Sequence, residues 1–299
     1  MNRLWITFVL ATAIARPLVS SPAFAQGNPP GTVTANAAIA GAEQFASDLH
    51  RGGNTTLSAG VMRQFVPAFA AGVTVRYDYQ SWRFDSPTAF GSDGPWRDLH
   101  HGSVGLNLSL ALSRSLLLGV SPAVEWAGEP GTDAGDGLIY GAVVSVAKVV
   151  SPRLVLGGGA SVSRQFYNVK TSPFVIINWR ITDRLRVANA AGASPLGGAG
   201  VEMRYAVTPD WEVAGGGVYR SDRFRLDARG RYAGQVGEAA GIPLLARISR
   251  RLDARSAVSV YAGAVIDGSL KIRDSDGREI VSDAYRPAPL VALMLMRRF

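Results

Sequence analysis

Residues 69–80, FAAGVTVRYDYQ, alternate between apolar side chains and small or polar ones along the whole segment. One set of positions comprises Phe69, Ala71, Val73, Val75, Tyr77 and Tyr79, and the other comprises Ala70, Gly72, Thr74, Arg76, Asp78 and Gln80. A helix would mix the two sets around its circumference, whereas a β-strand places successive side chains on opposite faces. The segment therefore predicts a strand with one apolar face.

The same alternation recurs along most of the chain. Apolar residues occupy every second position in most of residues 104–112, 116–126, 154–166, 201–207, 211–219 and 258–266. Glycines inside these runs, such as Gly157–Gly159, suit bends and close strand approach. No helix pattern follows them, as a phosphate-binding loop would require. The chain is therefore expected to be all β.

The connections between these segments come in two sizes. Short ones, rich in Ser, Pro and Asp, occupy residues 113–115, 151–153, 182–184, 208–210 and 252–255, and longer ones occupy residues 85–98, 129–136, 222–235 and 274–282. Alternating short and long connections are typical of an up-and-down barrel with short periplasmic turns and longer extracellular loops. The segments predict a transmembrane antiparallel barrel of about 12 to 14 strands, an even number with both termini periplasmic.

The N-terminus has the pattern of a secretory signal peptide. Arg3 gives a basic start, residues 4–15 are an apolar run, and Ala23, Phe24 and Ala25 form a small-residue cleavage pattern. We expect a signal peptide over residues 1–25, then a segment of residues 26–53 that either precedes the sheet or contributes its first strand, and a barrel over residues 54–299. The chain has no cysteine, which excludes a disulfide scaffold and a thiolate metal site.

Alternation alone also fits a β-sandwich or a lipocalin-like barrel, whose apolar face points inward. Aromatic residues favour a membrane barrel, because those on the apolar face gather at the two strand ends: Phe69, Tyr205 and Trp211 beside short turns, and Tyr77, Tyr79, Trp126, Phe166 and Tyr219 toward long loops. Amphipathic rings occupy both interfaces of a membrane barrel. Lys148 and Arg164 on the same face also fall at strand ends, where long side chains reach the headgroups.

Together these features resemble bacterial outer-membrane β-barrel proteins, in particular uncharacterised outer-membrane barrel domain families. The resemblance implies location in the bacterial outer membrane, contact with its lipids, and assembly by the barrel-assembly machinery. In that class a C-terminal aromatic residue forms part of the assembly signal, a position that Phe299 would occupy. The final segment, LVALMLMRRF, would be the closing strand that pairs with the first one, and its two apolar faces suggest a packed lumen near the inner rim.

With the apolar face outward, the other face supplies candidate lumen-lining residues. They comprise five basic and five acidic side chains: Arg76, Asp78, Glu125, Arg186, Glu202, Arg204, Glu212, Arg220, Arg247 and Asp267. Asn107 and Gln165 lie on the same face. Because both signs are mixed along the lumen, we expect paired charges and not a single-sign selectivity ring.

These residues support two functions. The first is a narrow channel for small hydrophilic solutes. The second is a non-conducting structural or surface-interaction barrel, with residues 85–98 and 222–235 as contact surfaces. A barrel of this size lies between small barrels that side chains fill and wide porins, so strand number does not decide between them.

Other classes of function have weaker support. The formal charge of +8 is scattered, so no nucleic-acid partner is indicated. A lipid hydrolase at the outer rim would need His100 or His101 beside Ser103, but the spacing indicates no third partner among His50 or the acidic residues. Two acidic loops offer oxygen ligands for calcium: Glu129, Asp133 and Asp136, and Asp274, Asp276 and Glu279. Neither loop has EF-hand spacing, so we expect no metal site. Taken together, these observations also predict no enzyme activity and no cofactor.

Overall fold

The computed structural model describes residues 31–299 except 32, 48–49, 85–88, 92–93 and 191–198. The described residues form sixteen β-strands: β1 (Val33–Ser47), β2 (His50–Val66), β3 (Phe69–Arg83), β4 (Asp98–Ala111), β5 (Leu116–Gly128), β6 (Leu138–Ser151), β7 (Leu154–Gln165), β8 (Asn168–Arg180), β9 (Leu185–Asn189), β10 (Val201–Ala206), β11 (Trp211–Gly217), β12 (Arg220–Arg225), β13 (Val236–Arg251), β14 (Ser256–Arg273), β15 (Glu279–Tyr285) and β16 (Ala288–Arg298). None of the described residues belongs to a helix that is long and apolar enough to cross a membrane. The predicted signal peptide lies outside this range, and β1 falls within the segment 26–53.

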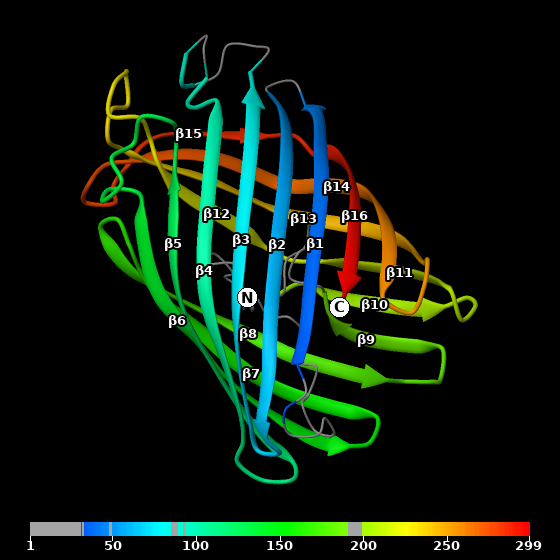
Figure 1. Cartoon of the computed structure of the whole chain (residues 1–299). Helices are drawn as coiled ribbons and strands as arrows, with labels where there is room; N and C mark the ends of the chain where they lie inside the picture. Colours follow the sequence, from blue (N-terminus) through cyan, green and yellow to red (C-terminus); the bar gives the residue numbers. More distant parts are fainter. Residues whose placement is uncertain (1–30, 32, 48–49, 85–88, 92–93, 191–198) are drawn as a thin grey trace, which may run out of the picture.

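The strands form one closed antiparallel barrel (Figure 1). β11 and β12 pair with successive halves of β13, and β16 and β15 pair with successive halves of β14. Each of these two pairs is a single strand with a break, so the described residues build a barrel of 14 strands. This confirms the predicted fold class and the even strand number.

The closing strand is the one that the C-terminal sequence predicts. β16 pairs with β1 from Asn36 opposite Arg298 to Gln44 opposite Leu290. The Phe299 amide extends the ladder by donating to the Ala35 carbonyl at 2.9 Å. The ends of the barrel sheet therefore meet, and no free edge is left along this seam.

Strand β3 is apolar on its outer face and polar on its inner face. Val73, Val75 and Tyr77 are 42%, 50% and 41% exposed, whereas Arg76 and Asp78 between them are 4% and 3% exposed. A soluble sandwich would bury the first set and expose the second. The apolar faces of these strands therefore point away from the barrel axis, as expected for a wall in contact with lipid.

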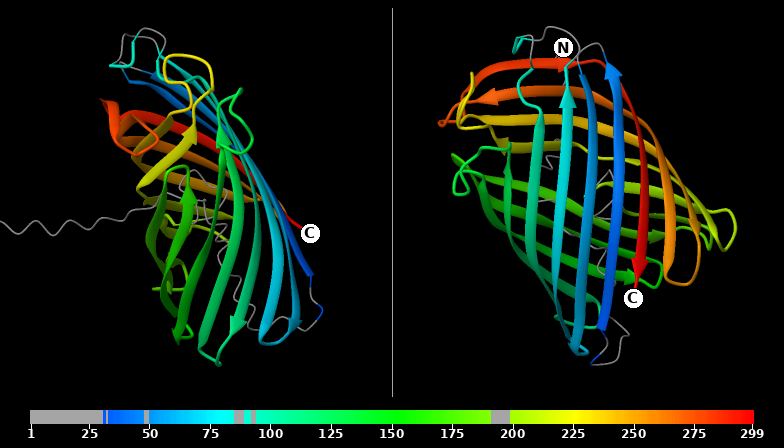
Figure 2. Two further views of the ribbon diagram at one scale, coloured as in Figure 1. Left: turned by 90° about the vertical axis from the view of Figure 1, so that its left-hand side faces the viewer. Right: turned by 45° about the horizontal axis from the view of Figure 1, so that its top comes forward.

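The two rims differ, as predicted from the connections. The inner rim carries the tight turns, such as residues 112–115, and the outer rim carries the long ones, such as residues 84–97. Front strands cross the rear ones at a steep angle in Figure 1, and both views of Figure 2 show the same tilted wall. Strong tilt is what closure of a sheet into a barrel requires.

Two outer connections differ from the prediction, and the size of a third was not predicted. Residues 220–225 are strand β12 and residues 279–285 are strand β15, so the predicted loops 222–235 and 274–282 shrink to residues 226–235 and 274–278. The connection between β7 and β8 is only residues 166–167, in which Phe166 has a positive φ of 45°. The charged residues of β12 led to the prediction of a loop here. Both faces of β12 contact protein, so neither face needs to be apolar.

Candidate functional site

The densest group of candidate lumen residues lies on β10, β11 and β13 and is called here the inner charge cluster: Glu202, Arg204, Glu212 and Arg247. Arg247 Nη2 lies 3.1 Å from Glu202 Oε2 and 2.7 Å from Glu212 Oε1, and Arg204 Nε lies 3.0 Å from Glu202 Oε2. Glu202 and Arg247 are both buried. The four groups balance in charge, so this part of the lumen is a neutral network and not a ring of one sign.

Neighbouring polar side chains extend the inner charge cluster. Arg247 also donates to Ser249, whose hydroxyl is 2.7 Å from that of Ser259. Arg186, on β9, donates from Nε to Asn178 Oδ1 at 2.7 Å. Buried polar groups with several partners each hold one arrangement of side chains.

A second ion pair occupies the opposite wall. Arg76 donates from Nε to Asp78 Oδ2 at 2.7 Å and from Nη2 to Oδ1 at 2.9 Å, and Thr56 also donates to Asp78. Nearer the inner rim, Asn107 donates to Thr74 Oγ1 at 2.6 Å. The polar faces of β2, β3 and β4 are therefore joined through side chains as well as through the backbone.

The remaining predicted lumen residues lie apart from these groups. Arg220 and Asp222 form a half-buried pair at 2.8 Å where β12 begins. Asp267 is exposed, has a positive φ of 52° and lies where the register of β13 and β14 shifts. The irregular backbone at Asp267 interrupts the alternation of β14. The lumen position of this side chain was predicted from that alternation.

The two adjacent histidines point to opposite faces, as strand geometry requires. His100 lies outside, with Nδ1 2.6 Å from the Tyr77 hydroxyl, and His101 lies inside, with Nδ1 3.4 Å from Glu125 Oε1. Glu125 is paired opposite Ser103 in the sheet. The His101 Nε2 atom is buried without a hydrogen-bond partner, and the nearby group is the Phe224 ring at 6.3 Å between centroids. The side chain of His50 is not described.

Aromatic residues fill the outer end of the lumen, a feature that the alternation did not predict. Phe224 of β12 and Trp96 are 0% and 3% exposed and meet edge to face, with ring centroids 4.8 Å apart. Phe90 and Leu99 are also buried in this outer aromatic cluster. A Cβ added at Gly237 would lie 2.3 Å from the Phe224 ring, so only glycine lets β13 pass this close. The cluster narrows the lumen on its outer side.

The outer loops are tied together over this cluster through Glu129. Its carboxylate accepts the backbone N–H of Arg97 at 3.2 Å and that of Asp227 at 3.0 Å, and its own N–H donates to the Arg225 carbonyl at 2.9 Å. Burial raises the pKa of Glu129 above its ordinary value of 4.5, although the two N–H donors act in the opposite direction. Residues 129–137 and 226–235, joined in this way, are called here the outer cap.

The acidic loops do not assemble a cation site. Among the described residues, no group of three or more His, Asp or Glu side chains gathers at one point. Glu129 is bound to backbone donors, and Asp274 accepts the N–H of Asp276 at 2.9 Å and that of Arg278 at 2.8 Å. The second loop therefore uses its aspartate for ordinary turn chemistry.

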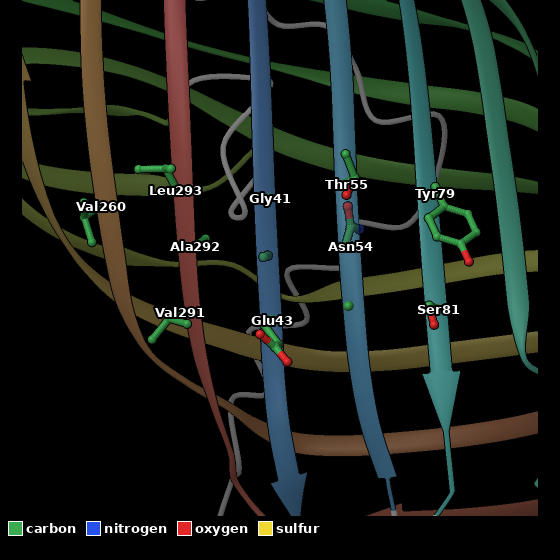
Figure 3. A pocket seen from close by; sticks show the side chains of 12 residues that line it. Gly41, Glu43, Asn54, Thr55, Tyr79, Ser81, Val260, Val291, Ala292 and Leu293 are labelled. Carbon is green, nitrogen blue, oxygen red and sulfur yellow. The ribbon is translucent and has the colours of Figure 1, made fainter.

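A groove of about 520 Å³ lies on the outside of the wall, across β14, β16 and β1–β3 (Figure 3). Gly41 and Thr55 leave space between Val291 and Leu293 on one side and Tyr79 on the other. Its location on the apolar face makes it part of the lipid-facing surface and not of the lumen.

No protein-family model matches the chain, and no curated protein matches it. Similar solved structures include an outer membrane channel from Pseudomonas putida F1, with a TM-score of 0.47 and 9% identity over 93% of this chain and 99% of that one. A Pseudomonas aeruginosa FadL homologue has a TM-score of 0.45 and 11% identity over 91% of this chain and 93% of that one. The toluene transporter TbuX of Ralstonia pickettii has a TM-score of 0.44 and 10% identity, with 93% of each chain covered.

The class of the protein follows from the barrel itself. A closed antiparallel barrel pairs the backbone groups of its strands with one another, and its outer face is apolar between two aromatic rims. The chain is therefore a transmembrane β-barrel.

Proposed function

We propose that the barrel is a narrow channel for small hydrophilic solutes. The observation that carries this proposal is the polar inner face, which extends from the inner charge cluster to Arg76 and Asp78 on the opposite wall. A lumen filled only for stability would gain more from apolar side chains, because buried ion pairs contribute little to stability. We propose as lining residues the members of both groups, together with Glu125, Arg186 and Arg220.

The same interior supports a small pore and not a wide one. The outer aromatic cluster and the outer cap cover the outer side, and Tyr261 and Met294 are buried on the inner face of β14 and β16. A barrel of about 14 strands is also narrower than the 16 to 18 strands of open porins. Solutes would pass beside these packed groups, along the polar faces.

Planar-bilayer recording of the purified, refolded protein tests this proposal. We expect small, discrete conductance steps with the folded protein and none with a boiled sample of the same preparation. Folding is checked independently through the shift in gel mobility upon heating. Correctly folded protein that inserts into the bilayer and gives no steps would contradict the channel.

The second candidate is a non-conducting barrel that acts through its surface. The burial of Phe224 and Trp96 at the outer side favours it, because a sealed lumen needs such a cluster. Residues 85–98 and 226–235 would then be the contact surfaces, although part of the first loop lies outside the described residues. Absence of conductance together with loss of surface binding upon deletion of residues 226–235 would support this candidate.

We propose no enzymatic activity. His101 and Glu125 have an arrangement that orients an imidazole, but no hydroxyl group among the described residues binds the buried Nε2, and the Phe224 ring lies nearby at 6.3 Å between centroids. His100 faces outward and binds Tyr77. Phospholipid hydrolysis that depends on His101 and Ser103 would overturn this part of the proposal.

A further inference from the structure

A second group of charges lies at the outer end of the wall, where β8 faces β12–β14. Glu238 of β13 lies at its centre: Arg223 Nε is 3.2 Å and Arg273 Nε 2.9 Å from Glu238 Oε2, and Ser221 donates to Oε1 at 2.6 Å. Glu238 is buried, and it holds both guanidinium groups in place. Arg223, Arg273, Glu238 and the nearby Lys170 are called here the outer basic cluster.

Lys170 brings an additional positive charge to this place from β8. It lies on the same face of β8 as the buried Ser172 and Phe174, which is the inner face. Its electrostatic neighbours are Arg223, Arg273, Glu238 and Asp222. No ion pair to Lys170 is present within the described part of the chain, because Glu238 binds the two arginines and Asp222 binds Arg220. The outer basic cluster therefore has an excess of positive charge inside the barrel.

Side chains, and not a backbone ladder, make the described contact between β8 and β12. Within the described residues, β9 pairs only with Asn178, Trp179 and Arg180 of β8, so the outer half of β8 has no partner on that side. The Arg223 guanidinium lies 5.9 Å from the centre of the Tyr167 ring in the turn before β8. The cluster is therefore located where the described backbone pairing of the wall is interrupted. Side chains connect β8 with β12 at this place.

Polar atoms without partners accompany these charges. The hydroxyl groups of Tyr167 and Ser163 are buried and have no hydrogen-bond partner among the described residues, and both belong to β7 or the turn that follows it. Buried hydroxyl groups of this kind are normally completed by water or by a ligand. Two hydroxyl groups and three cations thus meet in one region, and its central carboxylate, Glu238, is already bound to the two arginines.

We propose that the outer basic cluster binds a small oxyanion, the carboxylate or phosphate group of a solute. Guanidinium and ammonium groups are the usual partners of such oxyanions, and their attraction is strengthened where water is limited. Glu238 orients the two guanidinium groups, and Lys170 supplies a positive charge that forms no ion pair among the described residues. The consequence for selectivity, a preference for anions over cations, rests on the proposed channel function, whereas the binding itself does not.

Calorimetric titration of the refolded protein with inorganic phosphate at low ionic strength tests the site. We expect saturable binding by the wild type, about tenfold weaker binding by Lys170→Gln, and binding close to wild type by Lys170→Arg, which keeps the charge. Lys148→Gln is the matched control, because Lys148 is exposed on the outer face of β6. Absence of saturable binding to the wild type, or equal binding by Lys170→Gln, would overturn the proposal.

The reversal potential in a potassium chloride gradient tests the consequence for selectivity. We expect the wild-type channel to favour chloride, Lys170→Gln to reduce this preference severalfold, and Lys148→Gln to leave it unchanged. Phosphate binding without conductance would retain the site and reject the channel. Conductance without phosphate binding would retain the channel and reject the site.

Discussion

Arg247 shows at the scale of one residue how the lumen is held together. Its guanidinium binds Glu202 and Glu212, donates to Ser249, and lies 6.0 Å from the centre of the Tyr261 ring. Removing one member of a buried ion pair leaves its partners charged and without compensation, and this costs more than the pair itself contributes. Arg247 is therefore the residue of the inner charge cluster whose loss should matter most.

We expect Arg247→Met to destabilise the barrel by about 2–4 kcal/mol, since buried Glu202 loses one of its two arginine partners and Glu212 loses Arg247. The free energy of unfolding in urea, measured by the change in gel mobility, checks this value. Arg250→Met is the control on the same strand, because Arg250 is exposed and lies over the Trp211 ring at 5.3 Å. Its cost should stay below about 1 kcal/mol. Equal costs for the two variants would contradict the role of the cluster.

Glu129 gives the outer cap a dependence on pH. Its pKa is raised above 4.5, so the folded cap favours the neutral carboxyl group, and the carboxylates of Asp227 and Asp98 add to the effect of burial. The stabilisation is complete below pH 4.5 and is lost as the pH rises through the raised pKa. The cap should therefore loosen toward neutral pH.

Hydrogen exchange in residues 226–235, corrected for the intrinsic effect of pH, measures this loosening. We expect protection to fall as the pH rises above 4.5 in the wild type and to stay constant in Glu129→Gln, which cannot ionise. Asp133→Asn, at an exposed carboxylate in the same loop, should keep the wild-type dependence. Protection that rises with pH in the wild type would contradict this account.

At the scale of elements, β12 differs most from the other strands. It pairs with β13 along one edge and meets β5 at one position, Arg225 opposite Gly128. It carries Phe224 into the outer aromatic cluster and Arg223 into the outer basic cluster. One short strand thus contributes both to the narrowing of the lumen and to its charge.

We expect Phe224→Ala to raise the single-channel conductance about twofold or more, because the ring is fully buried in the narrow outer part of the lumen. Single-channel recording checks the change. Phe65→Ala is the matched control, since Phe65 faces outward near the inner rim and is exposed. A conductance that does not respond to Phe224→Ala would place the narrowest part of the pore elsewhere.

We propose a separate role in biogenesis for the C-terminal strand, as its resemblance to outer-membrane barrels implies. Phe299 is exposed at the inner rim beneath the Arg297 guanidinium, 5.5 Å from its ring centre, and its side chain is not needed for the core. We expect Phe299→Ala to lower the amount of folded protein in the membrane severalfold and Phe299→Tyr to restore it. Refolding in detergent should be similar for all three proteins, and a severe refolding defect of Phe299→Ala would contradict a role in recognition.

At the scale of the whole molecule, the sequence predicts the wall of the barrel well. Strict alternation in segments such as residues 69–80 predicts strand, face and orientation together, because lipid requires one face to stay apolar. The pairing of β16 with β1 follows from the need to close the sheet. Candidate lumen residues on regular strands, such as Arg76 and Arg247, lie where alternation predicts.

The interior is predicted less well, because it is determined by contacts between distant segments. Phe224 lies among Asp222, Arg223 and Arg225, so its run has no apolar face and resembles a loop. Lys170 and Tyr167 gain their neighbours from β12–β14 only in the folded barrel. The positive φ at Asp267 shifts the alternation locally, and the Asp-Gly pair at residues 267–268 is the sequence signal for such a bulge.

The central claim is that the apolar faces of the strands contact lipid and the polar faces line the lumen. The absence of native cysteines allows single spin labels at Val73, Thr74 and Val75 on β3, and at Leu293, Met294 and Leu295 on β16, in the protein reconstituted into lipid bilayers. We predict high accessibility to oxygen dissolved in the bilayer at Val73, Val75, Leu293 and Leu295, and low accessibility at Thr74 and Met294. Uniform accessibility along each strand, or the inverse alternation, would contradict the account.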